Sequence, residues 1–168
     1  MTQGIRFAEG IQVQCVFSPI DAAGLTTKTA HVNLAGANWL SFLINIGVTS
    51  SATSADLQVG ACCSTAATSA SAVPTLIPFS YRLSSTLGTS QYSWGAITTG
   101  STVGSVACTT GQDNISIWID IDPADCAAVG EDYQWAHLLF TTSASALPMS
   151  CVAFIEPRYP GLHILSST

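Results

Sequence analysis

Nonpolar residues recur at every second position along most of this chain. The clearest segment is NISIWIDI at residues 114–121, where one parity carries Ile115, Ile117, Ile119 and Ile121. Residues 38–47 (NWLSFLINIG) repeat the pattern with Leu40, Phe42, Ile44 and Ile46. Residues 11–17 (IQVQCVF) do so with Ile11, Val13, Cys15 and Phe17. Because successive side chains of a β-strand point to opposite faces, this period of two predicts strands with one buried face.

About ten segments of this kind follow one another, each bounded by Gly, Pro, Asn, Asp or clusters of Ser and Thr. They are residues 11–17, 28–34, 38–47, 55–62, 75–83, 91–98, 101–108, 114–121, 134–142 and 149–156. No segment keeps a 3.6-residue nonpolar stripe over three helical turns, so an α/β architecture loses its main support. Pro78, inside the fifth segment, predicts an edge strand or a bulge because proline cannot donate a backbone hydrogen bond.

Many short strands at this spacing predict an all-β fold, an antiparallel sandwich or barrel with Greek-key or jelly-roll connections. A chain of 168 residues is long enough to bury a core of its own. Neither a domain boundary nor an internal repeat divides it. We therefore expect residues 1–168 to form a single β-sandwich domain.

The two ends of the chain, residues 1–10 and 157–168, carry little of the core pattern. The second end nevertheless includes four nonpolar side chains, those of Tyr159, Leu162, Ile164 and Leu165. Such residues would be a liability on the surface of a solitary monomer. They are buried either as arms that dock on a neighbouring subunit or by packing across their own domain, and the sequence leaves both arrangements open.

Three carboxylates lie close together in the sequence, those of Asp120, Asp122 and Asp125. Such a group could hold a metal ion or divide acid and base roles, but each position also indicates a structural role. Asp120 falls on the polar face of its strand, whereas Asp122 stands where the N-cap of a helical turn opened by Pro123 should be. Asp125 is then at the third position of that turn, beside unpaired backbone N–H groups. A calcium loop would need more oxygen ligands and a flexible glycine, so we expect no metal site here.

Nucleophilic catalysis needs a base beside the nucleophile and a group that orients the base. The chain has no G-x-S-x-G motif, and His31, His137 and His163 lie in unrelated sequence contexts. His137 shares a strand face with Trp135 and Leu139, which is typical of a hydrogen-bonded structural histidine. The glycines of residues 98–105 (TTGSTVGS) lack the lysine of a phosphate-binding loop. We expect a protein that is not an enzyme, with no catalytic, cofactor-binding or metal-binding residues.

The six cysteines show no C-x-x-C pair and no histidine at ligand spacing. They are Cys15, Cys62, Cys63, Cys108, Cys126 and Cys151. Cys62 and Cys63 are adjacent, which suits neither a tetrahedral metal site nor an easy disulfide. The opening MTQGIRFAEG has neither the basic start nor the nonpolar core of a signal peptide, so we expect the chain to stay in the cytosol. Reduced, mostly buried thiols follow from that compartment.

Charge is sparse in this chain. Charged residues make up 8% of it, against about 25% in an ordinary soluble domain, so much of its surface is neutral and suits an assembled state. Four basic residues against ten acidic ones cannot build the basic patch that a nucleic-acid backbone requires. The most nonpolar run, residues 39–48, is about half the length of a membrane-spanning helix and contains Ser41 and Asn45. We expect neither nucleic acid nor membrane as a partner.

Tryptophan is the remaining candidate for function, at Trp39, Trp94, Trp118 and Trp135. Trp39 and Trp118 fall on the strand face opposite the main nonpolar set, so each is a candidate for exposure. A carbohydrate groove, a second buried sheet face and a subunit interface would each use them, since aromatic residues are enriched at interfaces.

Taken together, several segments resemble the small all-β virion proteins that tailed bacteriophages encode with their capsid genes. The segments are GIQVQCVFSPIDAAG (10–24), HVNLAGANWLSFLINIGVT (31–49), DLQVGACCST (56–65), NISIWIDIDPADC (114–126), YQWAHLLFTT (133–142) and CVAFIEPRYP (151–160). In that family the strand with its short acidic turn, the following strand and the closing RY recur in this order. The six cysteines and the long Ser/Thr/Ala loops depart from the family pattern.

Members of that family are generally decoration or cement proteins of the capsid, or other minor structural proteins, without catalytic residues. The resemblance therefore implies a capsid-exterior protein assembled in the host cytoplasm. Its partners would be the major capsid protein and further copies of itself, as a dimer or trimer. Two rival functions stay open: a tail- or fibre-associated module that binds host glycans through its tryptophans, and a small metal-dependent hydrolase that uses the aspartates.

Overall fold

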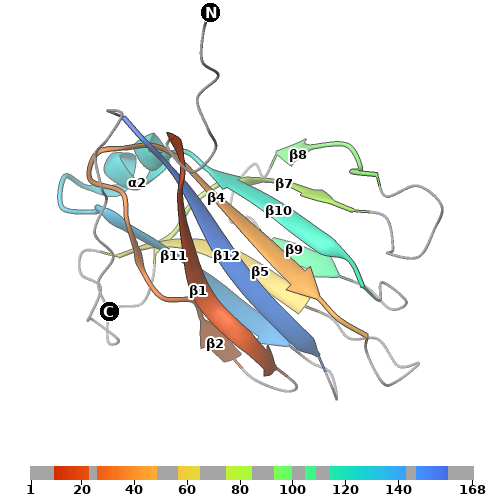
Figure 1. Ribbon diagram of the computed structural model, residues 1–168. Helices are drawn as coiled ribbons and strands as arrows, with labels where there is room; N and C mark the ends of the chain where they lie inside the picture. The colour runs from red at the N-terminus through yellow and green to blue at the C-terminus, as the bar shows by residue number, and fades with distance from the viewer. Residues whose placement is uncertain are drawn as a thin grey trace, which may run out of the picture.

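The structure is a computed structural model of the chain. It describes residues 10–22, 26–48, 57–64, 75–84, 93–99, 105–108, 114–142 and 147–158. Two antiparallel β-sheets lie face to face in it, with one short helix at one end of the sandwich (Figure 1). The predicted all-β sandwich is confirmed.

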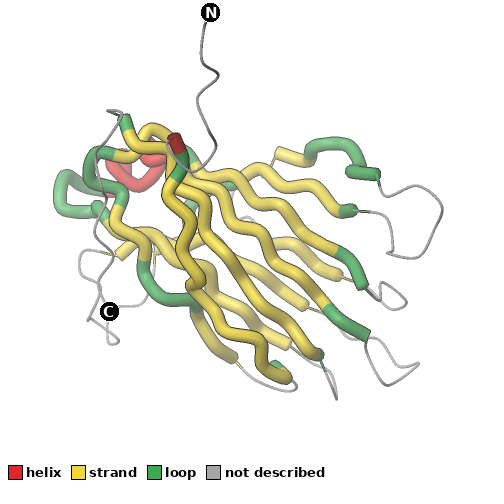
Figure 2. The backbone as a smooth tube through the Cα atoms, viewed as in Figure 1, coloured by secondary structure: helices red, strands yellow, loops and turns green. Residues whose placement is uncertain are grey.

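Within the described ranges each sheet has six strands. Figure 2 shows the strands of both sheets in yellow. Sheet A has the order β1 (Gln12–Asp21), β12 (Pro148–Pro157), β4 (Ala37–Ile46), β10 (Ser116–Ile121), β7 (Ser80–Leu83) and β8 (Thr98–Thr99). Sheet B has the order β2 (Thr26–Lys28), β11 (Trp135–Thr142), β5 (Leu57–Ser64) and β6 (Thr75–Leu76). In addition, β3 (Val32–Asn33) pairs with β11, and β9 (Ser105–Cys108) pairs with β5.

The pairing order of the main strands is that of a jelly roll. When β1, β2, β4, β5, β9, β10, β11 and β12 are counted in chain order, the first pairs with the eighth and the second with the seventh. The third pairs with the sixth and the fourth with the fifth. This is a long hairpin rolled into two sheets, the arrangement of the double Greek key. The short strands β6, β7 and β8 all belong to the segment that joins the fourth of these strands to the fifth.

The core between the sheets is filled by the alternating residues that the sequence pattern singles out. Leu40, Phe42, Ile44 and Ile46 of β4 are all buried. Ile117, Ile119 and Ile121 of β10 are completely buried, and Ile115, just before the strand, is nearly so. Both predicted faces are confirmed, because these two strands pair in an unbroken antiparallel register and keep one parity toward the core.

β1 departs from the predicted parity. Val13 is 52% exposed and Cys15 is exposed, whereas Val16 is buried and Phe17 packs against the core. The register against β12 shifts between Cys15 and Phe17, which is a β-bulge. Because one extra residue reverses the parity of a strand, the expectation that the four odd positions share one face is wrong here.

The predicted strand around Pro78 is divided between the two sheets. Residues 75–76 form β6 at one edge of sheet B, and residues 80–83 form β7 beside β10 in sheet A. Ile77 and Phe79, on either side of the proline, are both buried in the core between the sheets. Proline thus marks the point at which the chain crosses from one sheet to the other, and only the part of the segment before it, β6, is an edge strand as predicted.

The helical turn expected after β10 is present as α2 (Pro123–Val129). Asp122 is its N-cap, with Oδ1 accepting a hydrogen bond of 2.9 Å from the backbone N–H of Ala124. Pro123 opens the helix and Asp125 lies in its first turn, as predicted from their spacing. The helix extends to seven residues and buries Cys126.

A disulfide joins Cys63 of β5 to Cys126 of α2, so the expectation that all six cysteines are reduced is wrong for this pair. Neighbouring strand residues face opposite sides of the sheet. Cys63 therefore points into the core toward α2, while Cys62 lies on the other side of sheet B. The adjacency of Cys62 and Cys63 did not prevent the bond. Its two cysteines are 63 residues apart in the sequence, so local spacing could not predict their pairing. Cys15 and Cys151 are free thiols.

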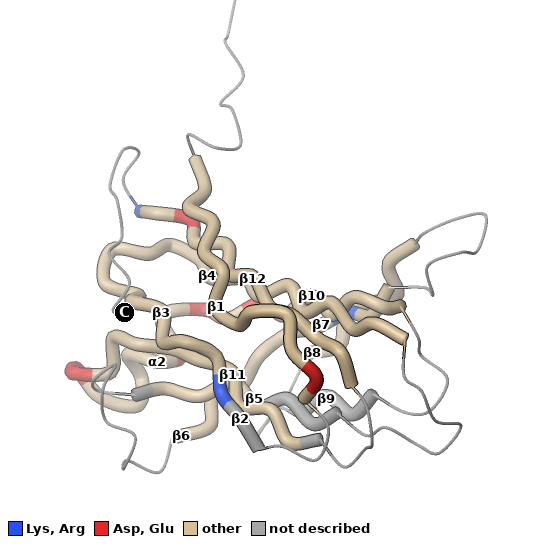
Figure 3. The backbone as a smooth tube through the Cα atoms, turned by 60° about the horizontal axis from the view of Figure 1, so that its bottom comes forward, with Lys and Arg blue, Asp and Glu red and all other residues tan. Residues whose placement is uncertain are grey.

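Both proposed arms lie almost entirely outside the described residues. Of residues 157–168 the structure describes Pro157, which ends β12, and Arg158, whose backbone N–H donates to the carbonyl of Gly36. Within the described parts of the chain, no helix has the length and nonpolar character needed to cross a membrane. Charged positions are few along the described backbone, and its lysine and arginine residues lie well apart (Figure 3).

Candidate functional site

The outer face of sheet A carries the most distinctive side chains of the molecule. The strand registers place them in two rows that run across the sheet. One row consists of Val13, Phe154, Ser41, Asp120 and Ser80. The next row consists of Cys15, Val152, Leu43, Trp118 and Arg82. Strand alternation produces both rows, because the opposite parity of the same strands fills the core.

A nonpolar patch occupies the half of this face formed by β1, β12 and β4. Its members are Val13, Cys15, Leu43, Val152 and Phe154. The first two are exposed and the other three are partly exposed. Single exposed nonpolar residues are ordinary, but neighbouring ones on adjacent strands form a continuous surface that is a common mark of a contact site.

On the β4–β10 side, Asp120 organises a polar and aromatic group. Its Oδ1 accepts hydrogen bonds from Ser41 Oγ at 2.5 Å, from Trp118 Nε1 at 2.7 Å and from Trp39 Nε1 at 3.3 Å. We call these four residues the Trp–Asp cluster. Hydrogen bonds to a carboxylate are stronger than those between neutral groups, so one oxygen holds two indole rings in defined orientations. No hydrogen bond between described residues uses the second oxygen, Oδ2.

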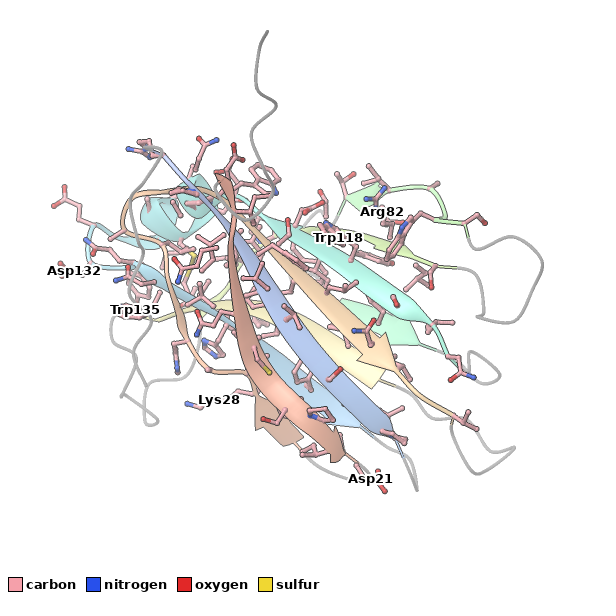
Figure 4. The ribbon with its side chains drawn as sticks, in the orientation of Figure 1. Asp21, Lys28, Arg82, Trp118, Asp132 and Trp135 are labelled. Atoms are coloured by element: carbon pink, nitrogen blue, oxygen red, sulfur yellow. A yellow bond between two sulfur atoms is a disulfide. The ribbon has the colours of Figure 1, made fainter. Side chains whose placement is uncertain are left out.

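Trp118 is also packed on both sides. Its ring stacks on that of Phe154, with centroids 5.3 Å apart, and meets Trp94 edge-on at 6.2 Å. The guanidinium of Arg82 lies 5.0 Å from the Trp94 centroid and 5.8 Å from that of Trp118, within the range of a cation–π contact. Arg82 and Trp118 lie close together at the end of sheet A farther from β1 (Figure 4). These neighbours hold Trp118 in place.

The four tryptophans are therefore not equivalent. Trp39 is 39% exposed and Trp118 partly exposed, which confirms the predicted outer-face positions of both. Trp94 joins them through the bridge between Ser84 and Trp94. Trp135 begins β11 in the other sheet, well away from Trp118 in Figure 4. The alternation along the strands predicted the outward positions of Trp39 and Trp118. It did not predict that Trp94, in the segment before β8, would lie against Trp118.

The structure separates the three aspartates. Asp120 lies on the outer face of sheet A, Asp122 caps α2, and Asp125 lies in the first turn of α2. Burial and the nearby Asp122 carboxylate raise the pKa of Asp125. Within the described ranges, no three side chains of His, Cys, Asp or Glu are arranged to hold a metal ion.

Two histidines in unrelated sequence contexts are neighbours in the fold. The rings of His31 and His137 are 4.4 Å apart between centroids, and both residues are buried. Cys62 of β5 is the register partner of His137 on the neighbouring strand β11. Sequence spacing gave no sign of this group, because His31 precedes β3 whereas His137 and Cys62 belong to β11 and β5.

The chemistry of this group does not suit nucleophilic catalysis. Burial, helped by His31 and Lys28, lowers the pKa of His137 to about 4, and burial raises the pKa of Cys62 to about 12. Both side chains are therefore neutral at pH 7, whereas the attacking form of cysteine is the thiolate. A hydrogen-bonded His137 was expected, but its Nδ1 has no hydrogen-bond partner among the described residues. His163 lies outside them.

Two hollows accompany these features. One, of about 470 Å³, lies where β1 and β4 end and β12 begins, and its lining includes Ile20, Gly47 and Met149. The other, of about 620 Å³, lies at the α2 end and is bordered by Asn38, Asp122 and Arg158.

No protein-family model matches the chain, and no curated protein or solved structure is significantly similar to it. What the outer face of sheet A binds must therefore be inferred from its own geometry and chemistry.

Proposed function

We propose that this chain is a structural protein of a bacteriophage virion that binds the capsid exterior as a cement or decoration protein. The nonpolar patch on the outer face of sheet A is the observation that carries the proposal. Val13 and Cys15 extend this surface to the edge strand, where a partner can approach without disturbing the core. Burying such a surface against another protein is favourable by about 25 cal/mol for each Å² of nonpolar area removed from water.

Three further features support this proposal. Cys62 and His137 are register partners, but burial keeps both side chains neutral at pH 7, so binding suits the chemistry of the described residues better than catalysis. Its low charge is compatible with contacts that exclude water over a broad area. Jelly rolls are common in viral capsid proteins, although they also occur in lectins and cupins, so the fold alone does not decide function.

The partners in this proposal are the major capsid protein and further copies of the chain, as a dimer or trimer. A cement protein stabilises only the assembled shell, because the surface it covers is complete only there. Symmetry repeats each contact many times over the particle. Residues 1–10 and 157–168 serve as arms in these contacts.

The test begins by locating the chain in purified particles and then changes the patch. Val13→Asp should fold normally, because Val13 is half-exposed, but its occupancy on particles should fall by about tenfold or more, since the contact would bury an unpaired carboxylate. Val129→Asp is the matched control: Val129 is 37% exposed on α2, away from the patch, and its replacement should leave occupancy unchanged.

Absence of the chain from the virion would refute the proposal. Equal occupancy of particles by Val13→Asp and the unaltered protein would refute the part assigned to the patch. Particles stripped of the chain should also lose infectivity at a lower temperature than complete particles.

A further inference from the structure

We propose that the Trp–Asp cluster is a binding site for a neutral saccharide, with Trp39 as the stacking surface and Asp120 as the hydroxyl acceptor. The site lies on the β4–β10 side of the outer face, beside the nonpolar patch rather than within it. It does not depend on attachment to a capsid, so it stands or falls independently of the proposed function.

Trp39 has the properties of a stacking surface. Its side chain is 39% exposed, and no described residue packs a ring against it. Its Nε1 edge is tied to Asp120 at 3.3 Å, so the ring plane is oriented before any ligand arrives. The negative face of an indole attracts the weakly positive C–H groups that cover one side of a pyranose ring. An ordered ring also loses less conformational entropy on binding than a mobile one.

Asp120 supplies the polar half of the site. Three neutral donors occupy Oδ1 and leave Oδ2 unused among the described residues. An ionised carboxylate only accepts hydrogen bonds, and a sugar hydroxyl is a good donor to it. Because the Trp39 indole N–H points at the same carboxylate, a sugar lying on the Trp39 ring has its hydroxyl rim next to Asp120. Stacking and hydrogen bonding can thus act on one sugar ring together.

The surrounding charges disfavour an anionic ligand. Glu156 pairs directly with Trp39 across β12 and β4 and is exposed. The basic side chain nearest to the cluster in the strand register, Arg82, contacts the rings of Trp94 and Trp118. A cationic ligand is the natural competitor, because carboxylates and indoles both attract it. Cation sites, however, usually enclose the charge within several rings, whereas no ring among the described residues packs against the 39% exposed Trp39, which suits a flat sugar better.

The experiment uses the whole chain and isothermal titration with neutral pyranose oligomers, namely maltohexaose, cellohexaose and chitohexaose. At least one should bind, and tryptophan emission should change on binding. Trp39→Ala should weaken that binding by about tenfold or more, and Trp39→Phe by less, because a smaller ring keeps part of the stacking. Asp120→Asn should also weaken it, while its amide oxygen can still hold the two indoles.

Two controls make the outcome decisive. Trp135→Ala removes a tryptophan from the other sheet and should leave affinity unchanged. Binding of a neutral sugar should also hold steady between about 0.05 and about 0.5 M salt, because no ion pair is screened. Failure of all three oligomers to bind, or full binding by Trp39→Ala, would overturn the proposal. Salt-sensitive binding of choline or polylysine that displaces the sugar would assign the site to a cation instead. Trp39→Ala should keep its place on particles, whereas Val13→Asp should keep its affinity for sugar.

Discussion

Asp120 shows how much one side chain can organise on a solvent-facing sheet. Its Oδ1 accepts three hydrogen bonds, and two of the donors belong to indole rings on different strands. Removing the carboxylate would leave both indole N–H groups to find water and would free the ring of Trp39, whereas Phe154 and Trp94 would still hold that of Trp118. An acidic residue that looked like a possible metal ligand is therefore better understood as the support of an aromatic surface.

The buried pair of His31 and His137 makes the stability of the fold depend on pH. The folded protein keeps His137 neutral because burial lowers its pKa from 6.5 to about 4, with smaller contributions from His31 and Lys28. Burial likewise lowers the pKa of His31. No acidic residue contributes to either shift. A neutral imidazole in the fold and a protonatable one in the unfolded chain link folding to pH.

Stability should therefore fall as the pH drops from about 6.5 to about 4, because the unfolded chain takes up a proton that folded His137 refuses. The lost free energy of unfolding is on the order of 3 kcal/mol for this histidine, from about 1.4 kcal/mol per pKa unit. Urea unfolding across this range measures it. His137→Gln should flatten the pH profile relative to the unaltered protein; two parallel profiles would contradict the assignment.

Among the elements, the start of α2 is specified by neighbouring residues, whereas the side chains that β1 turns toward the core depend on a distant strand. The cap of α2 is encoded within four residues, Asp122 to Asp125, and forms as the spacing predicts. The bulge of β1 is not local, because it exists only relative to β12, more than a hundred residues later. Before β12 is in place, nothing in IQVQCVF shows that Val13 and Cys15 face outward while Phe17 faces the core.

The cap makes a measurable contribution. Asp122→Ala removes the acceptor for the Ala124 N–H and should lower the free energy of unfolding by about 1 kcal/mol, the usual effect of losing such a cap. Asp132→Ala is the matched control, since Asp132 is an exposed aspartate in the turn after α2 and its side chain caps no helix. Thermal unfolding of the two variants should differ; equal melting temperatures would show that the cap is not needed.

At the scale of the whole molecule, the jelly roll joins the two ends of the chain in one sheet. β1 pairs with β12, and β12 also pairs with β4, so the last strand lies inside sheet A between the first strand and β4. Strands this distant in sequence must close a large loop, at a cost in chain entropy, before their pairing contributes favourable free energy. Such topologies therefore fold slowly. The disulfide between β5 and α2 shortens one of these loops and ties the helix to the sandwich.

Reduction should consequently destabilise the protein. Loss of the Cys63–Cys126 bond is expected to lower the free energy of unfolding by about 2–4 kcal/mol, because the reduced unfolded chain gains conformational entropy. Denaturant unfolding with and without dithiothreitol measures the difference. Cys126→Ser should have the same stability in both conditions, whereas Cys151→Ser, which removes a buried free thiol, should remain sensitive to the reductant. Insensitivity of the unaltered protein would mean that the bond does not form.

Local sequence pattern is enough to predict the class of fold, the buried faces of β4 and β10, the cap of α2, and the outward positions of Trp39 and Trp118. Each of these follows from a period of two or from a spacing of a few residues, which act locally. Other features arise only when the strands assemble: the parity of β1, the Cys63–Cys126 bond, the His31–His137 pair and the meeting of Trp39 and Trp118 on one carboxylate oxygen of Asp120. These depend on which strands become neighbours and in what register, and that choice is made by the whole core rather than by any one segment.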